Sequence, residues 1–351
     1  MKILTENLKK VLKIINYVIV EDSLRPLTGI IEMVADGDKL IINSSDFNNY
    51  INITIDLIEP AEFKAVIKRD KLITLVNATT KDIIEFNLKD KAVHIKGNGK
   101  YKLPLITEDG ENAVKYPQLV FNVEGLEGVK VDKNKVKNME KFNGIAVKLI
   151  PQREMLYNYY QTNDYIVTGD GSLITFSKGN IFKTDETITP KLIRFISVMD
   201  NPTVYSNATH YYLEDSNIKC KVYRFDTNFP ISIIEPFTKL VYTDKVELNL
   251  AEFKDVLKRL SIFADNLEMS PITMEFKDKL ILKIVDKGGE VLIEESINVR
   301  CVEYKCLMSL DILNLITKTL TGETFTLFYN SENSIAFEIP EVKIIEGLRA
   351  E

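Results

Sequence analysis

Apolar and polar residues alternate along most of the chain, which is the pattern expected of β-strands with one buried face. The alternation is clearest over 219–225 and 323–329. Glycine-containing turns at 36–38, 98–99 and 288–289 separate further short apolar runs and predict hairpins. The strands of these hairpins are expected over 29–35 and 39–43, 93–96 and 100–105, and 281–285 and 290–293. The chain is therefore expected to be rich in antiparallel strands.

Six segments instead have apolar residues at the three-and-four spacing of an amphipathic helix. They cover 6–19, 68–76, 132–142, 190–199, 250–263 and 309–320. In the first segment Leu8, Leu12 and Ile15 share one face. Asn249 stands before the fifth segment and Glu252 follows three residues later, which resembles a capping box. Helices and strands together predict an α+β fold.

The order helix, strands, helix, strands recurs three times along the chain. Leu8, Val136 and Phe253 occupy matching positions in it and are separated by 128 and 117 residues. One third of 351 residues is 117, so three such units account for nearly the whole chain. A repeat of pattern at this spacing predicts three tandem domains, each with two helices packed on antiparallel sheets. Their expected ranges are 1–120, 121–243 and 244–351.

The charged residues are distributed unevenly between helices and strands. The formal net charge of −6 by itself argues weakly against nucleic acid binding. In the six predicted helices, however, Lys and Arg number 16 and Asp and Glu 7, so the helices carry +9 and the rest of the chain −15. One basic helix face is ordinarily only a solvated face, but five of the six helices share the bias. Helices on one side of the strands would give a basic surface that contacts phosphates without reading bases.

The cysteines and histidines predict neither a disulfide framework nor a metal site. An odd number of cysteines, Cys220, Cys301 and Cys306, fits a reducing compartment and hence the cytoplasm. A structural zinc site needs four ligands, and the only histidines are His94 and His210. Buried, unpaired cysteine is the simpler interpretation.

Motifs of catalysis and membrane insertion are also missing from the sequence. There is no glycine-rich phosphate loop before a helix and no Gly-x-Ser-x-Gly, so neither an enzyme nor a cofactor is predicted. Asp46, Asp170 and Asp286 recur once per repeat, which turn chemistry explains more simply than a catalytic carboxylate set. No apolar run approaches the roughly 20 residues of a membrane helix, and the N-terminus does not resemble a signal peptide. No membrane partner is expected.

Several short motifs follow one another in a fixed order. They are Leu24-Arg25-Pro26-Leu27, Ser45-Asp46, Tyr116-Pro117, Thr168-Gly169-Asp170-Gly171-Ser172-Leu173 and Phe229-Pro230. In this order they resemble the bacterial sliding clamp, the beta subunit of DNA polymerase III. Each motif is weak alone, but their order and spacing hold over the whole chain.

The resemblance implies a ring. In this family two three-domain subunits associate head to tail, helices line a central hole around duplex DNA, and strands lie outside. Domain 1 of one subunit would contact domain 3 of the other, with Tyr101 and Leu103 packed against Ile262 and Phe263. The alternative is that these four residues belong to the cores of separate domains.

The resemblance also implies contacts to duplex DNA that do not depend on its sequence. Arg25 matches a family contact most directly, and Gln152 matches a second one loosely. The remaining candidates come from the basic helix faces. They are Lys9, Lys10, Lys13, Lys68, Arg69, Lys133, Lys137, Lys191, Arg194, Lys254 and Lys258.

A second site implied by the resemblance is a groove between domains 2 and 3 that binds short peptides of DNA polymerase and the clamp loader. Its residues would be Thr168, Gly171, Leu173, Pro230, Ile234, Leu310, Ser334, Ile344 and Ile345. The family's His-Arg in the groove motif is replaced by Ser172, and its usual Met-Pro-Met-Arg-Leu end by Ile-Glu-Gly-Leu-Arg at 345–349. These departures predict a different peptide preference and fit either a phage-encoded or a divergent bacterial member.

The rival to a clamp is a multidomain β-rich structural or adhesion protein without DNA activity. That class explains the strands, the acidity and the repeat. It does not explain amphipathic helices with lysine on the outer face, so the sequence favours a ring-forming, non-enzymatic processivity factor.

Overall fold

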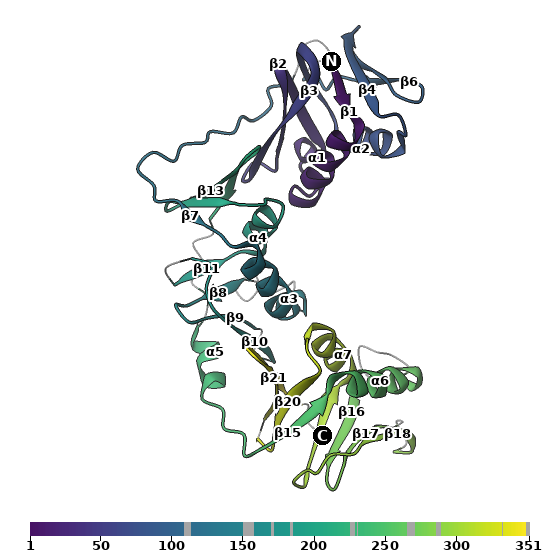
Figure 1. The fold of residues 1–351 in the computed structure, drawn as a ribbon, viewed down its shortest axis with the longest axis vertical. Coiled ribbons are helices and arrows are strands. Elements are labelled where there is room, and N and C mark those ends of the chain that lie inside the picture. Colours follow the sequence, from purple (N-terminus) through teal and green to yellow (C-terminus); the bar gives the residue numbers. More distant parts are fainter. Residues whose placement is uncertain are drawn as a thin grey trace. The chain divides into compact units, whose positions relative to one another are not determined.

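The computed structural model describes residues 1–108, 114–149, 158–169, 172–182, 185–224, 229, 231–264, 271–285, 289–331 and 333–348. The architecture is α+β, and every strand pair within these ranges is antiparallel. Contacts divide the chain into two compact units, each drawn in Figure 1. Unit 1 is Met1–Lys133 with Lys191–Asp226, and unit 2 is Asn134–Pro190 with Thr227–Glu351.

Unit 1 contains two sheets. The four-stranded sheet has the order β1 (Lys2–Leu4), β4 (Ile83–Lys89), β5 (Ala92–Lys96) and β6 (Lys100–Pro104). The six-stranded sheet has the order β2 (Ile30–Ser45), β3 (Tyr50–Lys68), β14 (Ile218–Tyr223), β13 (His210–Asp215), β12 (Thr203–Ser206) and β7 (Val129–Lys130). The helices are α1 (Thr5–Val18), the short η1 (Pro26–Gly29), α2 (Arg69–Ala78) and α4 (Pro190–Ser197). α1 and α2 pack against each other and bury Leu8, Leu12 and Leu72 completely or nearly so.

Unit 2 also contains two sheets. The eight-stranded sheet has the order β11 (Glu186–Ile188), β8 (Tyr159–Gln161), β9 (Tyr165–Gly169), β10 (Leu173–Lys178), β22 (Val342–Gly347), β21 (Ser334–Ile339), β20 (Thr324–Tyr329) and β15 (Asp244–Asn249). The four-stranded sheet has the order β18 (Val291–Ile297), β17 (Leu280–Val285), β16 (Pro271–Phe276) and β19 (Tyr304–Ser309). The helices are α3 (Lys133–Leu149), α5 (Ile231–Thr238), α6 (Leu250–Leu260) with η2 (Ser261–Phe263), and α7 (Leu310–Thr319).

All six predicted helices are present, and two of the three predicted hairpins form. Asn249 caps α6 by accepting a hydrogen bond from the Glu252 amide at 2.9 Å, as the capping pattern predicts. The hairpin expected at 36–38 is wrong, because β2 continues through Gly37 and pairs with β3 on both sides of a register shift. Gly37, at φ +69°, takes the left-handed conformation that suits a bulge as well as a turn.

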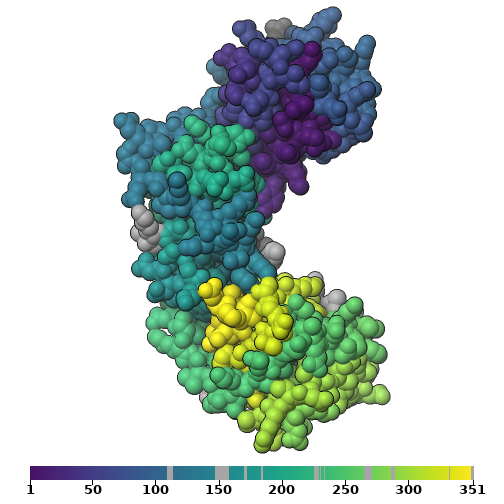
Figure 2. All heavy atoms as spheres, viewed as in Figure 1, coloured from purple at the N-terminus to yellow at the C-terminus, as the bar shows by residue number. Residues whose placement is uncertain are grey.

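One strand pair in each unit joins distant parts of the chain. In unit 1, β3 pairs with β14, with Ile53 opposite Ile218. In unit 2, β10 pairs with β22, with Thr175 opposite Ile344, and Figure 2 shows the yellow C-terminal strands beside blue-green residues of the middle of the chain. β14 and β22 are the last strands of the second and third predicted repeats. Each compact unit is thus built across a junction between repeats.

Candidate nucleic-acid interface

The lysines of α1 lie on the side of the helix that faces away from the core. Leu8, Val11 and Ile15 are buried on the opposite side. Lys10 and Lys13 are exposed, while Lys9 is half-buried and lies 3.3 Å from the Glu6 carboxylate. The sequence prediction of a basic outer face is confirmed for this helix.

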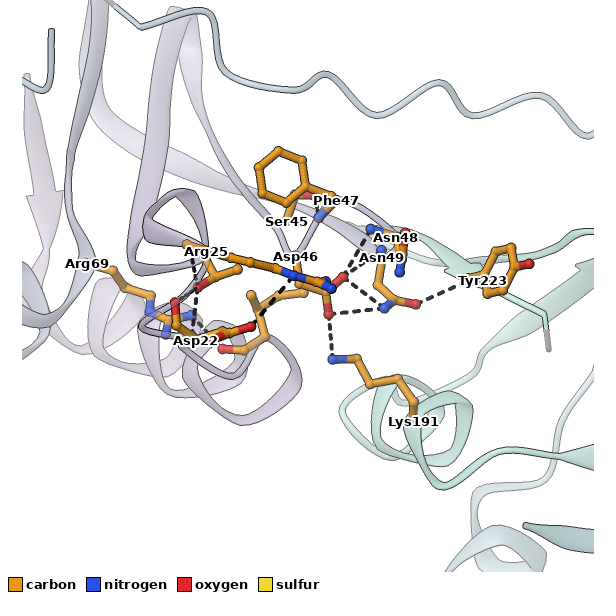
Figure 3. Close-up of polar contacts among 12 residues, drawn as sticks. Asp22, Arg25, Ser45, Asp46, Phe47, Asn48, Asn49, Arg69, Lys191 and Tyr223 are labelled. Atoms are coloured by element: carbon orange, nitrogen blue, oxygen red, sulfur yellow. Dashed lines mark hydrogen bonds and ion pairs between the residues drawn. The ribbon is translucent and has the colours of Figure 1, made fainter. Parts of the chain in front are cut away.

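Arg25 is presented by an ordered loop that follows α1. Its side chain is exposed, and its Nε lies 3.6 Å from the Asp22 carboxylate. The Thr28 hydroxyl donates to the Arg25 carbonyl at 2.8 Å and accepts from the Asp22 amide at 2.8 Å. Pro26 begins η1, and its ring fixes its own backbone φ. The guanidinium is therefore held near the surface by local contacts (Figure 3).

Asp46 organises the true turn between β2 and β3. One carboxylate oxygen accepts from the Asn49 amide at 2.8 Å and from its side chain at 2.9 Å, and the other accepts from Lys191 Nζ at 2.7 Å. Asn49 in turn accepts from the Tyr223 amide at 3.0 Å. Figure 3 shows these contacts converging on Asp46. Asp46 is a turn residue, as predicted. The ion pair with Asp46 neutralises the charge of Lys191 and joins α4 to this turn.

Arg69 does not present its charge to solvent. It is only 2% exposed, and its guanidinium donates to the Ile19 carbonyl at 2.5 Å. Burial lowers the pKa of this group from its ordinary value. Arg69 therefore joins the start of α2 to the end of α1, and the prediction that it lines a DNA-facing surface is corrected.

The other predicted DNA contacts differ in their exposure and in whether they form ion pairs. Lys133 Nζ lies 3.0 Å from Asp200, and Arg194 and Lys254 are half-buried. Gln152 lies outside the described residues. Within the described ranges, the remaining lysines are exposed and form no ion pair. They are Lys10, Lys13, Lys68, Lys137 and Lys258.

Two sheet edges carry exposed apolar side chains. Among the described strands, β6 has only β5 as a neighbour, and β18 only β17. Tyr101 on β6 is 39% exposed, and beyond α6 Ile262 and Phe263 are 75% and 46% exposed. Leu103 is half-buried. The alternative that these residues are core residues is wrong for Tyr101, Ile262 and Phe263.

An ion pair fixes β18 to α6. Arg259 Nε and Nη2 donate to the two carboxylate oxygens of Glu295 at 2.6 and 2.9 Å. The hydrogen bond from Arg259 lowers the pKa of Glu295 below its ordinary 4.5. Because the folded-state pKa is depressed, the stabilisation is present above pH 4.5 and is lost as the pH falls through the folded-state pKa.

We therefore expect acid to loosen β18 from α6. The protection factors of the β18 amides, which correct for the slower intrinsic exchange at low pH, should fall on acidification below pH 4.5 in the wild type. In Glu295→Gln these amides should already exchange faster at neutral pH and change less with pH. Identical pH profiles for the two proteins would mean that the ion pair does not hold this edge.

The predicted groove residues fall on both faces of the eight-stranded sheet. Leu173, Leu310 and Ile344 belong to the large core of unit 2 and are fully buried. Ile234 instead packs with Phe229 in a separate small cluster. Successive strand residues point to opposite faces, so Ile344 and Ile345 cannot both line one surface. Leu173, Leu310 and Ile344 are thus core residues, a correction to the predicted groove.

The other predicted groove residues that the structure describes are also buried from solvent. Thr168, Ser334 and Ile345 are buried, and the Tyr242 hydroxyl lies 3.0 Å from the Ser334 hydroxyl. Gly171 and Pro230 lie outside the described residues. Tyr242 was not predicted as part of this region, because no local pattern links it to Ser334, 92 residues away.

Other kinds of site find no support in the part of the chain that the structure describes. It contains no group of three His, Cys, Asp or Glu side chains placed to hold a metal ion. No described helix is long and apolar enough to span a membrane.

Comparison with known proteins identifies the fold. No family model matches the sequence, and no curated protein matches it either. Among solved structures, the DNA polymerase III subunit beta of Pseudomonas aeruginosa is similar over 100% of both chains, with a TM-score of 0.84 and 14% identity.

Two further solved structures agree. The sliding clamp of Bacillus subtilis has a TM-score of 0.82 and 16% identity, over 100% of this chain and 98% of that one. The beta sliding clamp of C. crescentus, with polyethylene glycol bound in a region proposed to tether the beta-motif, has a TM-score of 0.82 and 14% identity over 100% and 99%. The chain therefore has the fold of bacterial sliding clamps along its whole length, as the motif order predicted.

Proposed function

We propose that this protein is a sliding clamp: a non-enzymatic DNA polymerase processivity factor that closes into a ring around duplex DNA. The observation that carries the proposal is the pattern of strand pairing between repeats. It is supported by the clamp fold and by the exposed lysines of the helices.

The pairing pattern predicts how a ring closes. β3 follows Asp46 and β10 follows Asp170, and each pairs with the last strand of the next repeat. β18 is the strand that follows Asp286, and β6 is the last strand of the first repeat; both are open sheet edges. If β18 of one copy paired with β6 of a second, the same junction would form a third time. Two such contacts close a head-to-tail dimer of three-domain subunits.

The chemistry of the two edges supports this pairing. Lys100 and Lys102 are exposed on β6, while β18 carries Glu294 and Glu295, which in the single chain pair with Lys283 and Arg259. The apolar residues Tyr101 and Ile262 would be covered in the same contact. An open edge with exposed apolar residues is otherwise a liability for a protein that stays monomeric.

The proposed DNA contacts are Arg25, Lys10, Lys13, Lys68, Lys137 and Lys258. Such contacts hold backbone phosphates without reading sequence. A closed ring needs only weak contacts, because it cannot leave the DNA sideways. The domains we propose are 1–120, 121–243 and 244–351, with the ring located in the cytoplasm beside the replication machinery.

We further propose that client peptides of DNA polymerase and the clamp loader bind the outer face of the eight-stranded sheet in unit 2. Of the predicted groove residues that the structure describes, Ile234, Ser334 and Ile345 remain in this groove. Because the described groove residues are buried, binding requires Tyr242 or α5 to shift.

Retention on DNA of different topology tests the ring. The protein is loaded with a clamp loader onto nicked circular DNA, which is then cut with a restriction enzyme. We expect retention on the circle and loss on the linear form. Equal, salt-sensitive retention on both forms would mean ordinary charge-driven binding, and no retention on either would favour a structural or adhesion protein.

A further inference from the structure

A pocket of about 590 Å³ lies within unit 2, outside the residues predicted to contact DNA. Its walls are α3, the end of β10 with the following Gly179–Asn180 segment, and the turn between β21 and β22. Lys135 and Lys141 come from α3, and Lys178 from β10. Three lysines from two elements thus line one concave surface.

The pocket has an excess of positive charge. Within the described residues these three lysines form no ion pair, and Glu341 is the only carboxylate in the lining. Lys135 Nζ donates to the Asn180 carbonyl at 3.3 Å, and Lys141 Nζ lies 5.2 Å from the centre of the Phe142 ring. Neither contact neutralises an ammonium group. The exposed amide of Asn138 adds a neutral donor.

The pocket is held in shape by bonds beneath it. The Lys178 amide donates to the Glu341 carbonyl at 2.8 Å, and the Gly179 amide to the Asp164 carbonyl at 2.8 Å. Asn143 of α3 accepts from the Ser177 hydroxyl at 2.6 Å, which ties α3 to β10. A preformed site loses little freedom when a ligand binds, so even a small anion gains affinity there.

We propose that this pocket binds phosphate groups of the DNA backbone. Lysine ammonium groups and an amide donor suit phosphate oxygens, which accept several hydrogen bonds at once. Lys141 lines the pocket and lies about one helical turn after the exposed Lys137 on α3, so a DNA strand that contacted Lys137 would bring its neighbouring phosphates close to the pocket. The contact between a DNA strand and the pocket rests on the proposed function, whereas the binding of phosphate groups by the pocket does not.

The variant Lys135→Gln/Lys178→Gln tests the pocket. Its matched control is Lys245→Gln/Lys305→Gln, which replaces two exposed lysines of the same unit outside the pocket. Calorimetric titration with pyrophosphate should show affinity about tenfold or more weaker in the pocket variant and unchanged in the control. Thermal melting of both variants should match the wild type.

The salt dependence of DNA binding connects the pocket to the polymer. Each phosphate contact contributes about 0.9 to the slope of log affinity against log salt for duplex DNA. The pocket variant should therefore lose about one to two units of slope more than the control. Pyrophosphate affinity equal in both variants overturns the proposal, as does tighter binding of a poly-glutamate peptide than of DNA of equal charge.

The two proposals fail in different ways. If wild-type protein is not retained on circular DNA but the pocket variant alone loses pyrophosphate affinity, the pocket stands and the clamp falls. If the protein is retained topologically and pyrophosphate affinity does not change, the clamp stands and the pocket falls.

Discussion

Replacing both Ile262 and Phe263 with aspartate should convert the proposed dimer, of twice 40.1 kDa, into a monomer of 40.1 kDa. The two side chains are exposed in the single chain and follow α6, next to the open edge β18. Because Ile262 is 75% and Phe263 46% exposed, covering both contributes about 2–4 kcal/mol per contact, and a two-fold ring contains each contact twice. Aspartate removes this gain and adds charges that would be buried in the contact.

The measurement is molar mass by light scattering during size-exclusion chromatography. Val241→Asp is the matched control, because Val241 is 76% exposed, close to Ile262 at 75%, and lies outside the proposed contact. The control should remain a dimer. A dimeric double variant would contradict the β6–β18 contact, and a wild-type mass near three times 40.1 kDa would contradict two-fold closure.

Local patterns predicted the elements of the fold well. The helix starting at Leu250 follows from Asn249 and Glu252, which cap it as expected. The hairpin at Asn98–Gly99 joins β5 and β6 as predicted. In both cases the residues that decide the conformation lie within a few positions of one another, so a single stretch of sequence contains the whole physical cause.

Contacts between distant residues were not visible in the same way. Because Arg69 follows Lys68, the sequence predicts the same basic face for both, but the burial of Arg69 depends on the Ile19 carbonyl, 50 residues away. α5 was not predicted, because Pro236 inside an apolar run argues against a helix. The pairings of β3 with β14 and β10 with β22 also leave no local signal.

The candidate sites show the same limit. Strand alternation alone could have separated Ile344 from Ile345, and it would have removed one of them from the groove. The phosphate pocket could not have been found from sequence, because Lys135 and Lys178 are brought together only when α3 packs on β10. Counting charges along the sequence identified the basic helices. Which of their lysines and arginines are exposed and without an ion pair depends on the tertiary structure.

Replacing Asn143 with leucine should destabilise unit 2 more than any surface substitution on α3. Asn143 is fully buried, and its Nδ2 lies 3.0–3.2 Å from the Ile166 carbonyl and from both oxygens of Thr175. Its Oδ1 accepts from Ser177. Leucine has a similar size but leaves these polar groups buried without this partner, at a cost of about 3 kcal/mol or more.

The expected effect is a fall in the melting temperature of about 6–12 °C, given about 2–4 °C per kcal/mol for a unit of this size. Asn138→Leu, at an exposed position of the same helix, is the control and should change it by less than about 2 °C. Equal melting temperatures for the two variants would mean that the hydrogen bonds of Asn143 add little stability. Apolar residues such as Val136 and Met139 would then be enough to hold α3 in place.

The Asn143 variant also separates ring closure from DNA contact. Asn143 lies on α3, whereas the proposed ring contact involves β6, β18 and the end of α6. Below its melting temperature the variant should keep the mass of a dimer and lose affinity for pyrophosphate, because α3 carries Lys135 and Lys141 into the pocket. The Ile262 and Phe263 variant should do the opposite, keeping the pocket and losing the ring. Two variants with opposite effects would show that encirclement and phosphate contact are built from different parts of the same chain.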